Sequence, residues 1–260
     1  MQRNPTSHKG ENGKVAIIGG SRQIHGAPLL SSLAAEASGV DLVFVCLPRC
    51  HEEVAKQTAL NFQVHPFQGN ELATKDIPSI FELLATIDCA VIGPGIGRTP
   101  VIIDALDALI EGAPCPLVLD ATALHEKTRK LVHGKDVVLT PHLGELERMQ
   151  IDPDTIVSIA QEMKSTIVLK GMVDHISGKD GMIHKIKGGN AGLTVGGTGD
   201  TLAGLIAGLW AQKIEAIEAC SMACTIIKRA GTVLFHEKGY AYRAIDVINQ
   251  IPHLLHTYDQ

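Results

Sequence analysis

A glycine-rich turn that leads directly into an apolar helix is the stretch of this sequence best suited to chemistry. It reads N-A-G-L-T-V-G-G-T-G-D-T-L-A-G-L-I-A-G-L over residues 190–209. Gly196, Gly197 and Gly199 have no Cβ, so their backbone can lie close against a ligand. The first turn of the helix offers free N–H groups and the positive end of the helix dipole. We therefore expect a phosphate or an oxyanion to bind here.

Asp200 does not fit a plain anion site, because its carboxylate would repel a bound phosphate. One interpretation is a general base that accepts a proton from a substrate hydroxyl. The other is an N-cap, a position at which Asp is favoured. The helix behind it is apolar on every side, which predicts that it is buried and holds its first turn rigidly. We favour the base, because of the motifs that accompany Asp200 elsewhere in the chain.

The composition fits one large α/β domain over residues 1–260, with 45% hydrophobic residues to build a core. The net charge of −5 leaves no basic stripe of the kind that nucleic-acid binding requires. Residues 1–13 are polar, and no apolar run reaches the length of about 18 residues that indicates a membrane span. We expect a cytoplasmic protein that binds neither nucleic acid nor membranes. The six cysteines include no C-x-x-C pair, so we expect no zinc site.

Short apolar runs alternate with helical patterns along the chain, which is typical of a parallel sheet with helices on both faces. The predicted strands are residues 14–18, 42–47, 89–92, 117–119, 137–140 and 166–169. The predicted helices are residues 27–37, 78–85, 101–110, 215–234 and 245–249. Residues 173–176 and 182–186 predict an antiparallel hairpin. Residues 49–75 predict a loop-rich passage with one short helix.

Polar groups follow three of the predicted strands directly. Asp120 follows residues 117–119, His142 and Glu145 come just after residues 137–140, and Lys170 follows residues 166–169. Open α/β sheets bind their ligands at the carboxyl ends of their strands. The sequence therefore predicts that these groups converge on one edge of the sheet.

Short motifs in a fixed order carry a resemblance to a known family. They are His8-Lys9-Gly10, Ile17-Ile18-Gly19-Gly20-Ser21, Gly26-Ala27-Pro28, Ile92-Gly93-Pro94-Gly95-Ile96-Gly97, Leu119-Asp120-Ala121, Leu139-Thr140-Pro141-His142-x-Gly144-Glu145, Val168-Leu169-Lys170-Gly171 and Gly196-Gly197-Thr198-Gly199-Asp200. This set resembles the NAD(P)H-hydrate dehydratases of the ribokinase-like superfamily from about residue 8 to residue 252. Related sugar and vitamin kinases usually carry Asn where His142 stands. The resemblance implies a three-layer α/β/α fold with a mostly parallel central sheet.

The resemblance also implies an activity. Such an enzyme removes water from the S-form hydrate of NADH or NADPH, with ADP or ATP as phosphoryl donor and Mg²⁺ as cofactor. Phosphorylation of the C6 hydroxyl makes it a good leaving group, and loss of phosphate restores the nicotinamide ring. The family further implies a homo-oligomer, such as a tetramer. The aliphatic content of the helices predicted at residues 101–110 and 214–234 points the same way, because it exceeds what we expect one monomer to cover.

The resemblance assigns roles to individual residues. It implies Asp200 as the base that contacts the hydrate hydroxyl. Phosphoryl transfer also calls for Mg²⁺, and Glu145 is the best candidate to hold it, through water because this ion dehydrates reluctantly. The other implied hydrate-binding residues are Ala27, Gly95, Gly97 and His142. The implied nucleotide-binding residues are Lys170, Gly171, Met172, Val173, Asp174, Gly197, Thr198 and Gly199. The family pattern after the strand is closer to Lys-Gly-Ala-Gly-Thr, and Asp174 here places an acid near the phosphates. The family also usually has Asp-Ala-Asp-Ala-Leu-Asn where this chain has D-A-T-A-L-H from residue 120.

Other interpretations stay open at this stage. Glu145 could be a carboxylate in the first turn of a helix, favoured there by the dipole. Lys170 could be a strand-end lysine in solvent, and His142 could bond to a backbone carbonyl. For the whole chain, the alternatives are a small-molecule kinase of the same superfamily and a nucleotide-sensing module without catalysis. The sensing module would not need Asp200.

Overall fold

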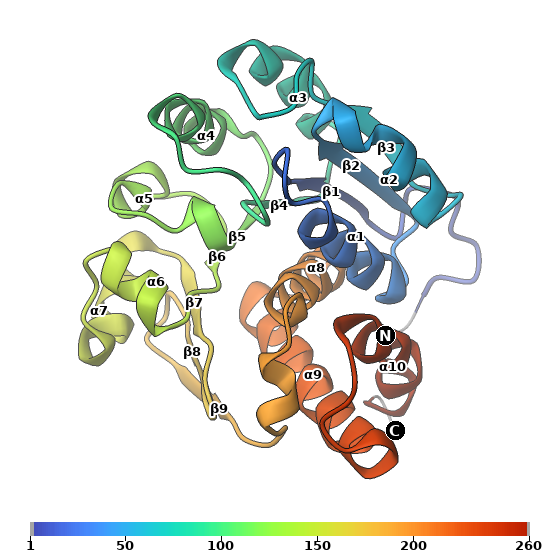
Figure 1. Cartoon of the computed structure of the whole chain (residues 1–260). Helices are drawn as coiled ribbons and strands as arrows, with labels where there is room; N and C mark the ends of the chain where they lie inside the picture. Colours follow the sequence, from blue (N-terminus) through green and yellow to red (C-terminus); the bar gives the residue numbers. More distant parts are fainter. Residues whose placement is uncertain (1–2, 259–260) are drawn as a thin grey trace.

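A nine-stranded sheet forms the middle layer of the computed structural model, which describes residues 3–258 (Figure 1). The strand order is β3-β2-β1-β4-β5-β6-β7-β8-β9. The strands are β1 (Lys14–Ile18), β2 (Leu42–Leu47), β3 (Gln63–Pro66), β4 (Cys89–Ile92), β5 (Leu117–Leu119), β6 (Val137–Leu139), β7 (Thr166–Leu169), β8 (Asp174–Ser177) and β9 (Ile183–Ile186). β1 to β7 run parallel, and β8 and β9 continue the sheet antiparallel. The predicted hairpin and the mostly parallel sheet are confirmed.

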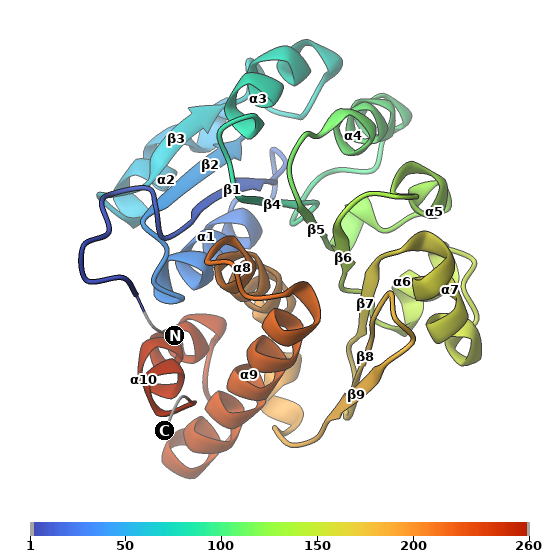
Figure 2. The same cartoon turned by 180° about the vertical axis from the view of Figure 1, so that it is seen from behind.

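Helices cover both faces of this sheet (Figures 1 and 2). One face packs against α1 (Gly26–Ala37), α2 (Glu52–Thr58), α8 (Thr198–Ala211), α9 (Ala216–Lys238) and α10 (Ala244–Tyr258). The other packs against α3 (Ile77–Leu84), α4 (Pro100–Gly112), α5 (Thr128–Leu131), α6 (Leu143–Arg148) and α7 (Ile156–Met163). β1 shows why two cores form: Val15 and Ile17 join the first, whereas Ala16 and Ile18 join the second. Alternate side chains of a strand point to opposite faces.

Two predicted segments need correction. Residues 49–75 hold the edge strand β3 as well as α2, whereas the sequence predicted only a short helix among loops. β3 has four residues, is half exposed and ends on Pro66, so it lacks the apolar run that marks an inner strand. The last helix, predicted at residues 245–249, continues through Pro252 to Tyr258. Its buried side chains, such as Leu254 and Leu255, pack against the core and hold the helix beyond the proline.

The close packing of α1 on α8 fixes the position of the glycine-rich turn. Gly204 and Gly208 face α1 so closely that a Cβ at either position would collide with Ser31 or Ser38. The Ser31 hydroxyl also donates a hydrogen bond of 2.6 Å to the main-chain oxygen of Asp200. The predicted burial of this helix is confirmed. The first turn of α8 is therefore held rigidly.

The structure removes one reason for expecting an oligomer. In α4 the large aliphatic side chains are mostly buried within the chain, and Val101, at 67% exposure, is the exception. α9 likewise buries its apolar side against α8 and α10. The oligomer stays a prediction that depends on the family resemblance alone. Among residues 3–258, no helix combines the length and apolar character needed to cross a membrane.

Candidate active site

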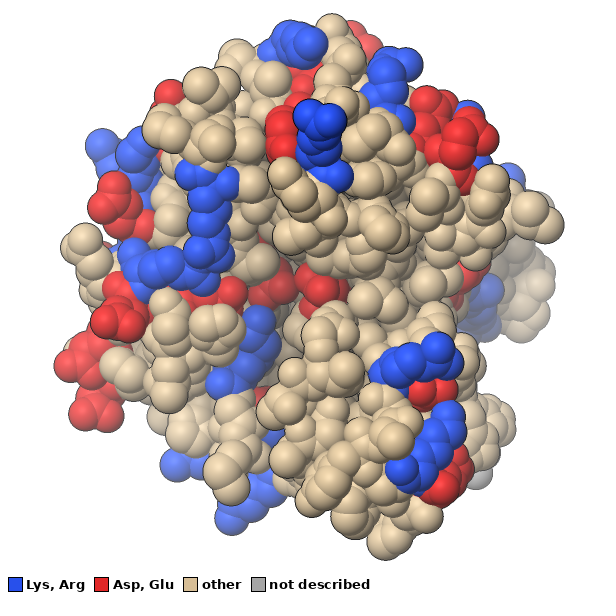
Figure 3. All heavy atoms as spheres, viewed as in Figure 1, with Lys and Arg blue, Asp and Glu red and all other residues tan. Residues whose placement is uncertain are grey.

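Three carboxylates and one lysine meet at the carboxyl edge of the sheet. Lys170, just after β7, places its Nζ 2.8 Å from Asp120 Oδ1 and 3.5 Å from Glu145 Oε2. Asp200, in the first turn of α8, is close enough for its charge to act on Lys170. The predicted convergence of the strand-end groups is confirmed. In Figure 3, acidic side chains lie near the centre of the face that shows α8, while basic and acidic groups intermingle elsewhere on it.

Asp120 is the best-anchored member of this cluster, which we call the acidic cluster (Asp120, Glu145 and Asp200, with Lys170 between them). Its Oδ1 accepts hydrogen bonds from Thr140 Oγ1 at 2.7 Å and from Lys170 Nζ at 2.8 Å. Its side chain is buried at the end of β5. The sequence placed Asp120 at this edge but gave it no role. Its partner at residue 170 lies 50 positions away, and only the strand order brings the two together.

Glu145 and His142 form a reciprocal cap at the start of α6. Glu145 Oε2 accepts the His142 main-chain N–H at 2.9 Å, and His142 Nδ1 accepts the Glu145 N–H at 3.2 Å. The expected first-turn position of Glu145 is confirmed. The alternative interpretation of His142, a ring bond to a backbone carbonyl, is wrong, because Nδ1 of the ring accepts from an N–H instead. The other Glu145 oxygen lies 3.4 Å from Arg148.

Asp200 is not the N-cap of α8, so that interpretation is wrong. The N-cap is Gly197, whose φ of 97° lies in the left-handed region. Asp200 lies three residues later, in the first turn. Its burial, followed by repulsion from Asp120, raises its pKa from 3.8 to about 7, although Lys170 opposes the change. Such a carboxyl can exchange a proton near neutral pH.

Lys170 is charged and only partly exposed, with 18% of its side chain accessible, rather than a lysine in solvent. Burial alone would lower its pKa, but the charges of Asp120, Glu145 and Asp200 together outweigh burial and raise the pKa. A Cβ built on Gly199 would lie 3.5 Å from the ammonium nitrogen, so Lys170 stands beside the first turn of α8. A fixed positive charge therefore accompanies the helix dipole at this point.

A cavity of about 680 Å³ opens next to the acidic cluster. The predicted residues that line it are His142, Lys170, Gly171, Met172, Asp174, Thr198 and Gly199. Val173, Gly197 and Asp200 are neighbours in sequence of lining residues but do not line the cavity themselves. Ala27 and Gly95 are placed together, since a Cβ on Gly95 would lie 3.2 Å from that of Ala27, but they are not part of this cavity, and neither is Gly97.

The loop of residues 170–174, which we call the nucleotide loop after its predicted role, holds its acid in contacts with other groups. The Asp174 carboxylate accepts the Gly171 N–H at 3.0 Å and lies 3.3 Å from Lys228 Nζ. Lys228 comes from the middle of α9 and was missed by the sequence analysis. Lys228 stands next to Arg229 in a largely apolar helical stretch, and nothing in that local sequence identifies its partner.

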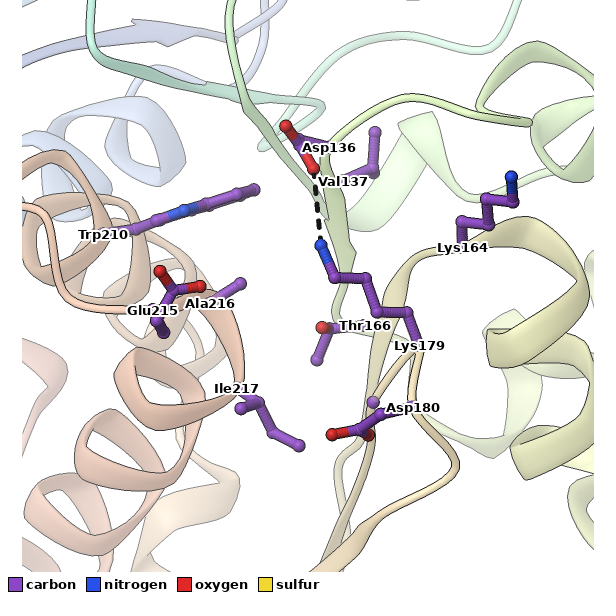
Figure 4. A pocket seen from close by; sticks show the side chains of 11 residues that line it. Asp136, Val137, Lys164, Thr166, Lys179, Asp180, Trp210, Glu215, Ala216 and Ile217 are labelled. Atoms are coloured by element: carbon purple, nitrogen blue, oxygen red, sulfur yellow. Dashed lines mark ion pairs between the residues drawn. The ribbon is translucent and has the colours of Figure 1, made fainter.

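A second cavity, of about 280 Å³, lies at the opposite edge of the sheet (Figure 4). Asp136 and Lys164, which line it, precede β6 and β7 rather than follow them. Trp210 and Ile217 approach it from the α8 and α9 side, and Lys179 lies 3.9 Å from Asp136 across it. This cavity is thus separate from the acidic cluster.

Comparisons with known proteins agree with this geometry. A family model described as NAD(P)H-hydrate dehydratase matches residues 15–253. The chain is 39% identical over 259 residues to the bifunctional NAD(P)H-hydrate repair enzyme Nnr of Methanocaldococcus jannaschii, covering 98% of this chain and 50% of that enzyme. It is 32% identical over 271 residues to the ADP-dependent (S)-NAD(P)H-hydrate dehydratase of Nitrosopumilus maritimus, covering 99% and 93%. The chain spans about half the length of the bifunctional relatives that it matches.

A solved structure is similar to this chain over nearly its whole length. The ADP/ATP-dependent NAD(P)H-hydrate dehydratase from Bacillus subtilis, co-crystallised with ATP and Mg²⁺, has a TM-score of 0.79 and 25% identity, covering 99% of this chain and 94% of that one. The predicted ribokinase-like fold is confirmed. The match to the family model extends over most of the sequence, including every member of the acidic cluster. The chain therefore belongs to the NAD(P)H-hydrate dehydratase family.

Proposed function

We propose that this protein dehydrates the S-form hydrate of NADH or NADPH, with ADP or ATP as phosphoryl donor. The observation that carries the proposal is Asp200, a partly buried carboxyl with a pKa of about 7 in the first turn of α8. It stands beside a cavity large enough for a nucleotide and within range of the charge of Lys170. Family membership and the names of the relatives support the choice of substrate and donor.

The proposed first step is phosphoryl transfer to the hydrate. Asp200 accepts the proton of the C6 hydroxyl, whose oxygen attacks the terminal phosphorus of the nucleotide, and the bond to AMP or ADP breaks. Negative charge on the transferred group is stabilised by N–H groups of the turn at Gly197 to Gly199 and by Lys170. In the second step the C6–O bond breaks and phosphate leaves. Loss of a proton from the neighbouring ring carbon restores the double bond.

Mg²⁺ fits this site through water rather than by direct coordination to Glu145. Both Glu145 oxygens already have partners, His142 and Lys170 on one side and Arg148 on the other. No group of three or more His, Cys, Asp or Glu side chains among residues 3–258 is arranged to hold a metal. Mg²⁺ usually keeps several waters and binds nucleotide phosphates, so Glu145 would orient a metal-bound water. The ion would supply charge neutralisation on the phosphates.

The test is incubation of the protein with NADPH hydrate, Mg²⁺ and either ADP or ATP. We expect the near-ultraviolet absorbance of reduced nicotinamide to return, together with release of inorganic phosphate. A reaction without nucleotide is the control. A stable phosphorylated product, with no return of absorbance, would instead identify a kinase. Nucleotide binding without any turnover would favour the sensing module.

The proposed reaction should speed up as the pH rises through about 7, because Asp200 must be deprotonated to act as a base and its pKa is about 7. The measurement is kcat/KM against pH at constant ionic strength, since this ratio reports groups of the free enzyme. A profile that is flat between about pH 5.5 and 8.5 would contradict the assignment.

The same carboxyl has an opposite effect on stability. Its pKa is higher in the folded than in the unfolded protein, so between pH 3.8 and about 7 the folded state binds the proton more tightly. The contribution of Asp200 to the free energy of unfolding therefore falls as the pH rises through this window and is constant above it.

A further inference from the structure

We propose that Lys228 and Asp174 act as a positioning pair that keeps negative groups of the nucleotide loop away from the bound nucleotide. This inference rests on the proposed function, because it concerns the same nucleotide cavity. The pair joins the middle of α9 to the end of the loop, and both residues border the cavity of about 680 Å³. Neither belongs to the acidic cluster.

The Lys228 ammonium is engaged within the loop. Its Nζ donates to Gly171 O at 3.0 Å and to Met172 O at 3.2 Å, and forms an ion pair with Asp174 Oδ2 at 3.3 Å. Two of its three N–H donors are therefore used by main-chain oxygens, and its charge is paired with a carboxylate. In this arrangement Lys228 holds the loop and does not bind a phosphate oxygen.

Burial of both side chains strongly favours this paired arrangement. Lys228 is 6% exposed and Asp174 is 7% exposed, so neither charge is well hydrated. A buried charge without a partner is strongly unfavourable. The Asp174 carboxylate also accepts the Gly171 N–H at 3.0 Å, which closes the loop on itself. The side chains of Asp174 and Lys228 thus hold the loop folded around them, next to Lys170.

The electrostatic consequence concerns the nucleotide. Two carbonyl oxygens and one carboxylate are negative groups, and any of them turned into the cavity would repel ADP or ATP. Lys228 holds all three. The loop has an acid where the family pattern Lys-Gly-Ala-Gly-Thr has none. Because Lys228 pairs with this acid, no uncompensated negative charge lies near the phosphates. Lys228 acts here through the loop, not by touching the nucleotide.

The experiment measures ADP and ATP affinity by calorimetry in four variants and the parent. Lys228→Met leaves Asp174 uncompensated and should weaken nucleotide binding roughly 10- to 100-fold. The double variant, Lys228→Met with Asp174→Asn, lacks both charges. Its nucleotide affinity should lie within a few-fold of that of Asp174→Asn alone. Arg229→Met, on the exposed side of the same helix, removes an equal charge and should bind like the parent. The KM for the hydrate at saturating nucleotide should stay close to the parental value in every variant.

Three results would overturn the inference. The first is a nucleotide affinity of Lys228→Met equal to that of the parent. The second is a double variant whose nucleotide affinity stays as low as that of Lys228→Met, which would indicate a direct phosphate contact by Lys228. The third is a parent protein that binds no nucleotide. If Lys228→Met does not fold, the comparison of the double variant with Asp174→Asn still decides the matter. A parent protein that binds nucleotide but does not convert the hydrate to NADH or NADPH contradicts the proposed function alone, and the nucleotide affinities still test the pair.

Discussion

Asp200→Asn should reduce kcat for hydrate turnover by at least about a hundredfold, while the protein folds and still binds nucleotide. Asn cannot accept the hydroxyl proton, and general-base catalysis typically contributes 10²–10⁴-fold in rate, an order-of-magnitude range. Nucleotide affinity should be equal or higher, because a carboxylate near the phosphates has gone. The measurements are kcat, melting temperature and nucleotide affinity on one preparation.

The structure removes one ambiguity from this test, namely whether Asp200→Asn would also disturb the cap of α8. Since Gly197 and not Asp200 is the N-cap, the substitution removes no cap from α8. It also removes a partly buried carboxyl whose pKa is raised, so above pH 7 the melting temperature should hold or rise. Asp104→Asn, at an exposed position of α4, is the matched control. Turnover near the parental rate would eliminate Asp200 as the base.

Lys170→Ala should weaken nucleotide binding by about tenfold or more, and much more than it weakens hydrate binding. Lys170 is the charged group beside the first turn of α8, and its removal also leaves Asp120 buried without its cation, while Glu145 keeps only Arg148. Breaking a buried pair in this way typically costs roughly 3–5 kcal/mol of stability. Calorimetric nucleotide affinity, the KM for the hydrate and chemical denaturation measure the three effects.

A second variant separates binding from stability. Lys170→Ala combined with Asp120→Asn removes the uncompensated carboxylate, so stability should partly recover while nucleotide affinity does not. If the single variant binds nucleotide as tightly as the parent, the assignment of residues 170–174 to the nucleotide is wrong. Recovery of affinity in the double variant would show that Lys170 acts on nucleotide only by neutralising Asp120.

The inner part of the fold could be predicted from the sequence because its signals are local. β1, β2, β4, β5 and β7 have the bounds that their apolar runs predict, since inner parallel strands are buried on both faces. β3 was missed for the opposite reason: at the edge, one face and one backbone side meet solvent, so the strand needs few apolar residues.

The site was predictable in position but not in its pairings. Strand ends placed Asp120, Glu145 and Lys170 at one edge, because a parallel sheet brings carboxyl ends together. The contact of Lys170 with Asp120, and that of Lys228 with Asp174, depend on side chains 50 or more residues apart in sequence. No local pattern encodes such pairs. The roles assigned to Ala27, Gly95 and Gly97, and the single domain over residues 1–260, stay predictions.

The two edges of the sheet determine how copies of this protein can meet. β3 ends on Pro66, which has no N–H to donate, and β9 carries the exposed Lys185 and is followed by the exposed Lys187. Lysine and proline at edge strands discourage pairing with another chain, because like charges would be apposed and a ladder bond would be missing. We therefore expect this sheet not to extend from one molecule into the next. Aggregation through cross-molecular strands is disfavoured, and any assembly would have to use the helical faces.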